Sequence, residues 1–234
     1  MSITSIREAL ADHAHPPRAE KKQIFFKTGV GEYGEGDVFI GVPVPEIRQL
    51  SRKWYHRLAR RDIEELLYAE IHEERRLALC ILVLQFQKGD KKIKKEVYDY
   101  YMAHIGQVNN WDLVDSSASY IVGAYLYARE RDILHKLVRS RNLWERRIAI
   151  VSTHYFIRQK DFETTIALAT KLLGDSHDLI HKAVGWMLRE VGKQDEAVLI
   201  AFLDTHAALM PRTMLRYALE RLEEPVRRHY MKVK

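Results

Sequence analysis

The segment NNWDLVDSSASY, residues 109–120, aligns with four other segments of the chain, and this internal repeat decides the fold. The other four are EERRLALCILVL (73–84), LWERRIAIVSTH (143–154), LIHKAVGWMLRE (179–190) and RTMLRYALERLE (212–223). The alignment brings Arg76, Asp112, Arg147, Lys182 and Arg216 into register, at steps of 36, 35, 35 and 34 residues. Periods of about 33 to 47 residues are typical of solenoids in which each repeat is a pair of helices.

Hydrophobic periodicity indicates helices almost throughout the chain. Apolar residues recur every three or four positions, as in IEELLYAEI (63–71), and alternating β-branched runs are nearly absent. The ankyrin and tetratricopeptide signature patterns are missing, which leaves HEAT-like repeats. We therefore predict an all-α superhelical solenoid as a single domain over residues 1–234, with N-terminal helices and a glycine-rich turn in residues 1–54. First helices of the repeats are expected at 91–105, 131–140 and 161–174.

The basic residues predict a binding surface for a polyanion. The chain has 38 Lys and Arg against 32 Asp and Glu, a net charge of +6. In a stack of helix pairs, the second helices share one side, and four of the five register residues are Arg or Lys. The second helices also carry Arg75, Arg146, His181 and Arg189. We expect a basic concave groove suited to a phosphate backbone; the alternative is that each cation pairs with acidic neighbours such as Glu73, Glu74 and Glu145.

Other sequence features exclude several classes of protein. No apolar run is long enough for a membrane span, the N-terminus lacks signal-peptide character, and Cys80 lies in an apolar run, so we expect a cytoplasmic protein with a buried thiol. No His or Cys pattern has metal-ligand spacing, and we predict neither metal nor cofactor. GVGEYG (29–34) matches a dinucleotide-binding pattern, but no strand precedes it, and we interpret it as a turn.

One column of the repeat contains an exception. Three residues after the register position, the repeats hold Leu79, Asp115, Ile150, Gly185 and Leu219. Burying an unpartnered carboxylate costs several kcal/mol, so we expect Asp115 to be neutralised, ion-paired with a neighbouring repeat, or exposed in a cavity. Trp111 lies one turn earlier on the same helix face. Asp112, by contrast, fits a capping or first-turn role at the helix start.

Tryptophans are the second unusual feature of these helices. Trp144 and Trp186 occur in the next two repeats. Aromatic rings interleaved with cations are what base stacking and sugar contact require, although an isolated tryptophan is more often part of a core.

Together these segments resemble the AlkD-type DNA alkylation repair glycosylases, a family built from HEAT-like repeats. The resemblance covers FFKTGVGEYGEGDVFIGVPVPEIRQLSRKW (25–54), NNWDLVD, NLWERRIAIVS and HKAVGWMLREVGK, and extends to about residue 222. In that family, a Trp-x-x-x-Asp pair and an Arg of the next repeat form the active site; they match Trp111, Asp115 and Arg147. Where one branch of the family has a tyrosine lining the cleft, this chain has Phe25 and Phe26, a departure that concerns lesion preference.

The resemblance implies hydrolysis of the N-glycosidic bond of N3- or N7-alkylated purines in double-stranded DNA by a monofunctional, monomeric enzyme. Asp115 would stabilise positive charge on the deoxyribose, Trp111 and Trp186 would pack against sugar and backbone, and Arg147 would bind a phosphate and keep the carboxylate charged. Further backbone contacts are expected from Arg76, Arg146, Lys182, Arg189 and Lys193. The alternative is a non-catalytic module that binds nucleic acid or an acidic protein, and a carboxylate at position 115 gives such a module no advantage.

Overall fold

The computed structural model describes residues 3–233, in which all extended regular structure is helical. Within these residues, β-type pairing is limited to an isolated parallel bridge between Val38 and Ile71. The prediction of an all-α fold is therefore confirmed. The chain forms two compact units, Met1–Ser117 and Ala118–Lys234, which we describe separately; the expectation of a single domain stays a prediction. No helix in the described part of the chain is long and apolar enough to cross a membrane.

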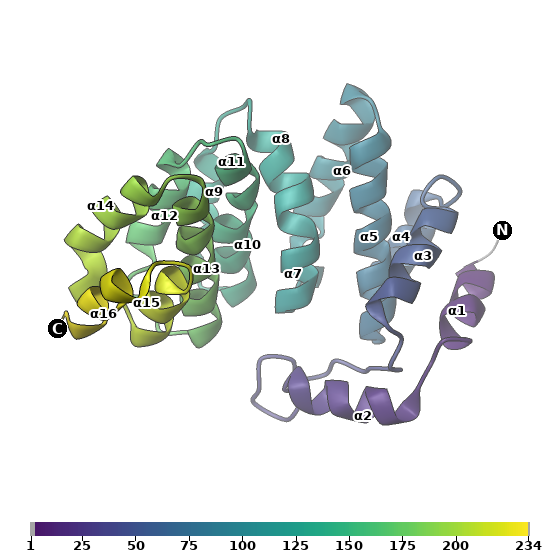
Figure 1. Cartoon of the computed structure of the whole chain (residues 1–234). Helices are drawn as coiled ribbons and strands as arrows, with labels where there is room; N and C mark the ends of the chain where they lie inside the picture. Colours follow the sequence, from purple (N-terminus) through teal and green to yellow (C-terminus); the bar gives the residue numbers. More distant parts are fainter. Residues whose placement is uncertain (1–2, 234) are drawn as a thin grey trace. The chain divides into compact units, whose positions relative to one another are not determined.

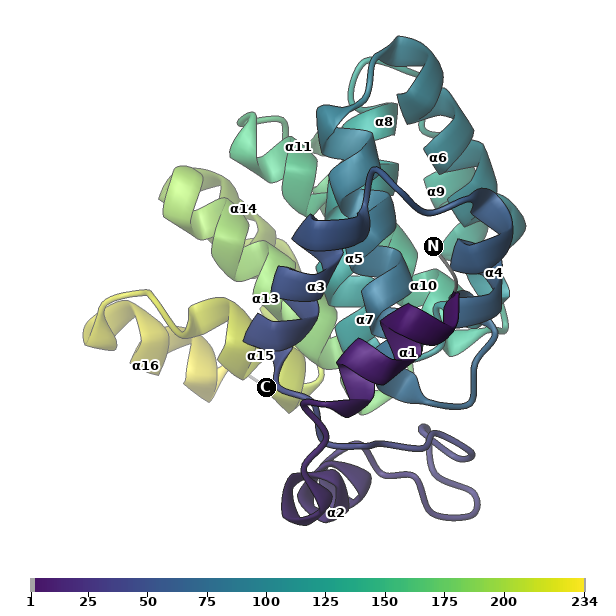
Figure 2. The same ribbon diagram turned by 90° about the vertical axis from the view of Figure 1, so that its right-hand side faces the viewer.

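The first unit is organised around one long helix, α5. Its elements are α1 (Ile3–Ala11), α2 (Pro16–Phe25), α3 (Val44–Trp54), α4 (Arg60–Leu67), α5 (His72–Lys88), α6 (Lys91–Ala103), a 3-10 turn (Ile105–Gln107) and α7 (Trp111–Ala118), which ends at the first residue of the second unit. Helices α3, α4 and α6 all pack against α5. Figures 1 and 2 both show α2 at one end of α3 and α5.

Helix α5 is buried because its apolar residues cover more than one face. Leu77, Leu79, Ile81 and Leu82 are fully buried, which is the pattern of a helix surrounded by others. Cys80 is half-buried rather than buried, and its sulfur forms no disulfide. Burial raises the pKa of this thiol, so it stays protonated at neutral pH.

The glycine-rich segment is a loop closed by its own side chains, as expected for a turn. Gly31 and Gly36 have φ angles of 78° and 84°, a conformation in which other residues are strained. The carboxylate of Glu32 accepts a hydrogen bond from the Gly29 amide, and that of Glu35 accepts one from the Gly31 amide. These amides are therefore occupied and do not form an open phosphate site.

The second unit contains the remaining helix pairs. It comprises a π-helical turn (Ser119–Gly123), α8 (Ala124–Leu126), α9 (Asp132–Leu137), α10 (Leu143–Ser152), α11 (His154–Arg158), α12 (Glu163–Lys171), α13 (Asp178–Gln194), α14 (Glu196–His206), a 3-10 turn (Ala207–Leu209), α15 (Arg212–Leu219) and α16 (Glu224–Lys232). Helix α13 packs against α10, α14 and α15 (Figure 1). The first helices expected at 91–105, 131–140 and 161–174 correspond to α6, α9 and α12.

Residues of the apolar column pack as the repeat predicts. Leu79, Ile150 and Leu219 are fully buried. Gly185 is at a close approach between α13 and α15, since a Cβ atom there would lie 2.5 Å from both the Met214 carbonyl oxygen and the Tyr217 Cβ. The repeat thus uses a glycine where two second helices come too close for a side chain.

This close approach predicts the effect of Gly185→Ala on stability. Relief of the glycine's helix penalty contributes up to about 1 kcal/mol, whereas overpacking against backbone costs about 1–3 kcal/mol. We expect a lower free energy of unfolding in urea titrations. Gly174→Ala is the matched control, because nothing lies within 4 Å of a Cβ at that position. An unfolding midpoint for Gly185→Ala equal to or above that of Gly174→Ala would contradict the packing.

Candidate functional site

Helix α5 begins with five consecutive ionisable residues, HEERR (72–76). Each of their side chains forms a hydrogen bond or ion pair with a residue of another segment. Glu73 is fully buried and accepts hydrogen bonds from Lys22 of α2 and from the amides of Ile40 and Gly41. Glu74 pairs with Arg7 of α1 at 2.9 Å. The start of α5 therefore ties α1, α2 and the loop before α3 to one place.

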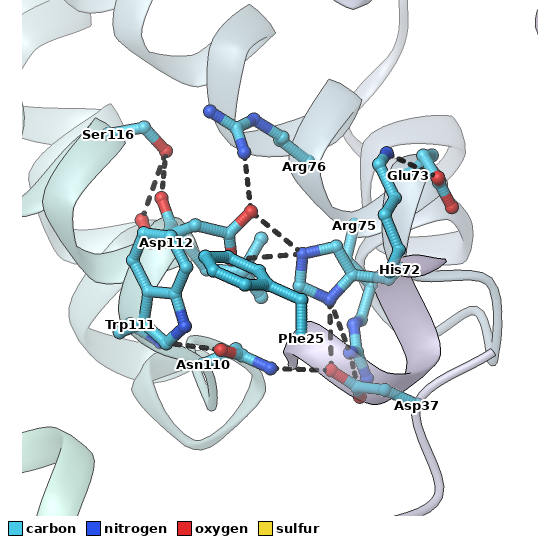
Figure 3. Close-up of polar contacts among 12 residues, drawn as sticks. Phe25, Asp37, His72, Glu73, Arg75, Arg76, Asn110, Trp111, Asp112 and Ser116 are labelled. Carbon is cyan, nitrogen blue, oxygen red and sulfur yellow. Dashed lines mark hydrogen bonds and ion pairs between the residues drawn. The ribbon is translucent and has the colours of Figure 1, made fainter. Parts of the chain in front are cut away.

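The other three residues of HEERR form a buried cluster with the loop and α7 (Figure 3). We call the residues Asp37, His72, Arg75, Arg76, Asn110 and Asp112 the His72 cluster. The His72 Nδ1 lies 2.9 Å from an Asp37 oxygen. Its Nε2 lies 2.9 and 3.0 Å from the two Asp112 oxygens. The imidazole is only 1% exposed, so no bulk solvent can take the place of either carboxylate.

Arginines and an amide complete the cluster. Arg75 pairs with Asp37, and Arg76 pairs with Asp112. Asn110 donates from Nδ2 to Asp37 at 2.8 Å, and its Oδ1 accepts from the Trp111 amide at 2.8 Å. Asn110 thus links the loop to the first residue of α7.

Charge decides the protonation of this cluster. Burial alone would lower the pKa of His72, but the Asp112 and Asp37 carboxylates outweigh it and raise that pKa above its usual 6.5. Burial would likewise raise the pKa of Asp112 and of Asp37, but His72 and the arginines hold both below their usual value. All three shifts favour the charged forms, an imidazolium between two carboxylates.

Asp112 needs a correction to its expected role. It lies in the first turn of α7, as predicted, but its carboxylate faces α5 and bonds His72 and Arg76 instead of serving as a cap. Arg76, expected to contact DNA, is likewise held in this buried pair and is only 14% exposed. Helix α7 is thus fastened to α5 through side-chain charges.

An aromatic stack lies beside the His72 cluster. Phe26 lies between Phe39 and Trp111, with ring centroids 4.8 Å and 5.0 Å away and an angle of 7° to the indole. Phe39 also stacks on the His72 ring at 4.5 Å. We call Phe39, Phe26 and Trp111 the aromatic stack. Phe25 meets the Trp111 ring edge-on at 5.8 Å and is 64% exposed.

Asp115 lies one helical turn after Trp111, on the same face of α7. It is half-buried, in a column where Leu79, Ile150 and Leu219 are fully buried. Its charge reaches Tyr101 of α6: burial raises the pKa of that phenol, and Asp115 raises it further. The first unit thus holds Phe25 and Phe26 against Trp111, one helical turn before Asp115 on α7.

The remaining predicted site residues belong to the second unit. Arg147 is buried in α10, and its Nη1 donates to the Leu179 carbonyl oxygen at 2.5 Å. Trp186 of α13 is half-buried and lies 5.5 Å from the His154 ring. Trp144 is 9% exposed and belongs to the core.

Four of the basic residues that were predicted to contact DNA are ion-paired within this unit. Arg146 pairs with Asp175 at 2.6 Å, and Lys182 pairs with Asp178 at 2.7 Å. The same holds for Arg189 with Glu220 and for Lys193 with Glu190. Arg216 is exposed. Pairing with nearby carboxylates, the alternative considered for single cations, therefore holds for most of the predicted contacts, and it lowers the positive potential that they offer to a polyanion.

Sequence reasoning missed His72, Asp37 and the pairing role of Asp112. One signal was available: five consecutive ionisable residues at the start of a helix point in all directions, so some must be buried beside the apolar run that follows. The partners of His72 come from segments 35 and 40 residues away in sequence, and no local signal identified them. In the described residues no group of three or more His, Cys, Asp and Glu is arranged to hold a metal ion.

Comparisons with known proteins agree with the repeat architecture. A family model described as "DNA alkylation repair enzyme" matches residues 6–222. A solved structure titled predicted DNA alkylation repair enzyme from Enterococcus faecalis is 19% identical, with a TM-score of 0.72, over 91% of this chain and 98% of that one. AlkD2 from Streptococcus mutans is 15% identical, with a TM-score of 0.54, over 94% of this chain and 97% of that one. No curated protein matches the chain in sequence.

The raised pKa of His72 predicts how stability changes with pH. Because the folded state binds this proton more tightly than the unfolded state, the stabilisation is fully present below pH 6.5 and is lost as pH rises through the folded pKa. We expect the free energy of unfolding from urea titrations to fall as pH rises above 6.5. His72→Gln should remove that fall, and an equal slope in both proteins would show that His72 is not the group responsible.

Proposed function

The chain belongs to the DNA alkylation repair enzyme family, and from this premise we propose that it is a DNA glycosylase acting on cationic N3- or N7-alkylated purines in double-stranded DNA. The observation that carries the proposal is the half-buried carboxylate of Asp115 in a column where the other repeats have apolar or small residues. A protein that only binds a polyanion gains nothing from a negative charge there, whereas a hydrolase of this bond requires one.

The substrate's own charge determines what the protein must supply. An alkylated purine that is already cationic is a good leaving group, so its departure needs no general acid. As the bond from C1′ to the base nitrogen breaks, its electron pair leaves with the base, and positive charge develops on the deoxyribose. Asp115 stabilises that oxocarbenium-like charge and can take a proton from the water that attacks C1′, which balances the reaction.

Trp111 provides the second group of the proposed site. Its indole lies one turn before Asp115, so a sugar held against the ring is brought toward the carboxylate. Phe25, exposed and edge-on to the same ring, extends this aromatic surface. The family pattern adds Arg147 as a phosphate ligand and Trp186 as a backbone contact from the second unit. Phosphate contacts from Arg146, Lys182, Arg189 and Lys193 require exchange of their present carboxylate partners, whereas Arg76 stays in its buried pair with Asp112.

Asp115→Asn is the direct test of the mechanism. The amide keeps the size of the side chain but removes the charge, and electrostatic groups of this kind contribute roughly 3–4 kcal/mol to transition states. We expect the single-turnover rate of 7-methylguanine release from methylated duplex DNA to fall by a factor of at least about 100. DNA affinity should stay equal or increase, because a negative charge next to the DNA is lost.

The matched control is Asp99→Asn, which removes one carboxylate from the exposed face of α6, where it pairs with Lys95. It should retain the wild-type rate. If wild-type protein releases neither 7-methylguanine nor 3-methyladenine, the glycosylase proposal fails and a non-catalytic DNA-binding role remains.

DNA binding through phosphate contacts predicts a steep dependence on salt. Each neutralised phosphate contributes a slope of about −0.9 to the log of the association constant against the log of salt concentration. Two contacts already weaken binding about tenfold between 50 and 200 mM salt. Fluorescence anisotropy with an unmethylated duplex measures this slope, and a flat response would refute binding through the basic residues.

A further inference from the structure

His72 belongs to both the ion-pair cluster and the aromatic surroundings of α7. Its two ring nitrogens face Asp37 of the loop and Asp112 of α7, and the face of its ring stacks on Phe39. The ring centroid of Phe26 lies 5.3 Å from that of His72, and Phe26 also stacks on Trp111. Two independent routes, one of charge and one of ring stacking, therefore lead from His72 to the first turn of α7.

The geometry favours the charged form of the ring. A neutral imidazole has one N–H and one lone pair, and that lone pair would point at a carboxylate oxygen 2.9 Å away. With both nitrogens protonated, each donates to a carboxylate. The ring is 1% exposed, so water cannot relieve the repulsion that loss of the proton would create.

Charged groups face the His72 ring from the loop, from α7 and from α5 itself. Asp37 faces it from the loop, Asp112 faces it from α7, and Arg75 and Arg76 lie on its own helix, with the Arg75 Nη2 3.4 Å from Nδ1. Deprotonation of His72 therefore leaves two ionised carboxylates that no longer share a donor.

We infer that His72 is a positioning residue for the site on α7: as an imidazolium it fixes the first turn of that helix against α5 and so sets the places of Trp111 and Asp115. The inference rests on the proposed function for its effect on rate. Asp112 lies between those two residues in sequence. If its carboxylate changes position against His72 and Arg76 of α5, the first turn of α7 moves with it, and so do Trp111 and Asp115. Misplacement of a reacting group by about 1 Å costs about 100-fold in rate.

The test compares His72→Gln with a matched variant on the same helix, Glu74→Gln. Glutamine at 72 can donate to one carboxylate while its carbonyl faces the other, and it carries no charge. Glu74 is also buried and ion-paired, but its partner is Arg7 of α1 instead of a residue of the His72 cluster. Both substitutions should lower stability, and only the first should alter the site.

Two readouts separate positioning from a general loss of stability. At saturating protein, the single-turnover rate of base release should fall about 10- to 100-fold in His72→Gln, with DNA affinity within about twofold of wild type. The rate of Glu74→Gln should stay unchanged. Equal rates in wild type and His72→Gln would overturn the inference.

The second readout does not depend on catalysis. The chain has four tryptophans, and incorporation of 5-fluorotryptophan gives each a fluorine resonance, with that of Trp111 assigned from Trp111→Phe. His72→Gln should shift or broaden the Trp111 resonance, and Glu74→Gln should leave it in place. If wild-type protein releases no base, the glycosylase proposal fails, while this resonance still decides whether His72 positions α7.

If His72→Gln does not fold, a pH titration of the wild-type protein tests the inference instead. The Trp111 fluorine resonance and the His72 ring protons should then titrate together, with a common midpoint above 6.5, the usual pKa of histidine. A Trp111 resonance that does not move while His72 loses its proton would overturn the inference.

Discussion

The first unit depends on the pairing of ionisable side chains at the start of α5. Burying a charge without a partner costs several kcal/mol, so residues 72–76 are tolerated at this position only when the segments that hold their partners are in place. Those partners come from α1, α2, the loop after α2 and α7. A single stretch of five residues therefore imposes the arrangement of the N-terminal elements, which apolar packing alone would leave loosely determined.

Helix α2 shows why this constraint matters for the site. None of its residues is buried, so its amphipathic face does not fix its position. Lys22 reaches Glu73 and the Val42 carbonyl oxygen, while Arg18 reaches the Gly41 carbonyl oxygen. Phe26, directly after the helix, then stacks on Trp111. The aromatic surface beside Asp115 is thus held by polar contacts to α5, which ties local electrostatics to the geometry of the proposed reaction.

Sequence patterns predicted the parts of the structure that repeat. The register of about 35 residues predicted the helix pairs, and the column of Leu79, Ile150 and Leu219 is buried as expected because packing of second helices recurs in each repeat. It also singled out Asp115 as the exception. The same pattern did not predict the His72 cluster, because Asp37 lies in an irregular loop outside the repeat. The register also predicted that basic residues recur on the second helices. Their carboxylate partners could be found only from three-dimensional contacts.

The stacking of Phe26 on Trp111 also limits how a ligand can approach. An indole has two faces, and one is already occupied by a ring held nearly parallel to it. Phe39 backs Phe26 in turn, so the occupying ring cannot withdraw without disturbing the core beside His72. In the proposed site, the face of Trp111 opposite Phe26 is therefore the one left for a sugar or base, and the protein sets this direction of approach before any ligand binds.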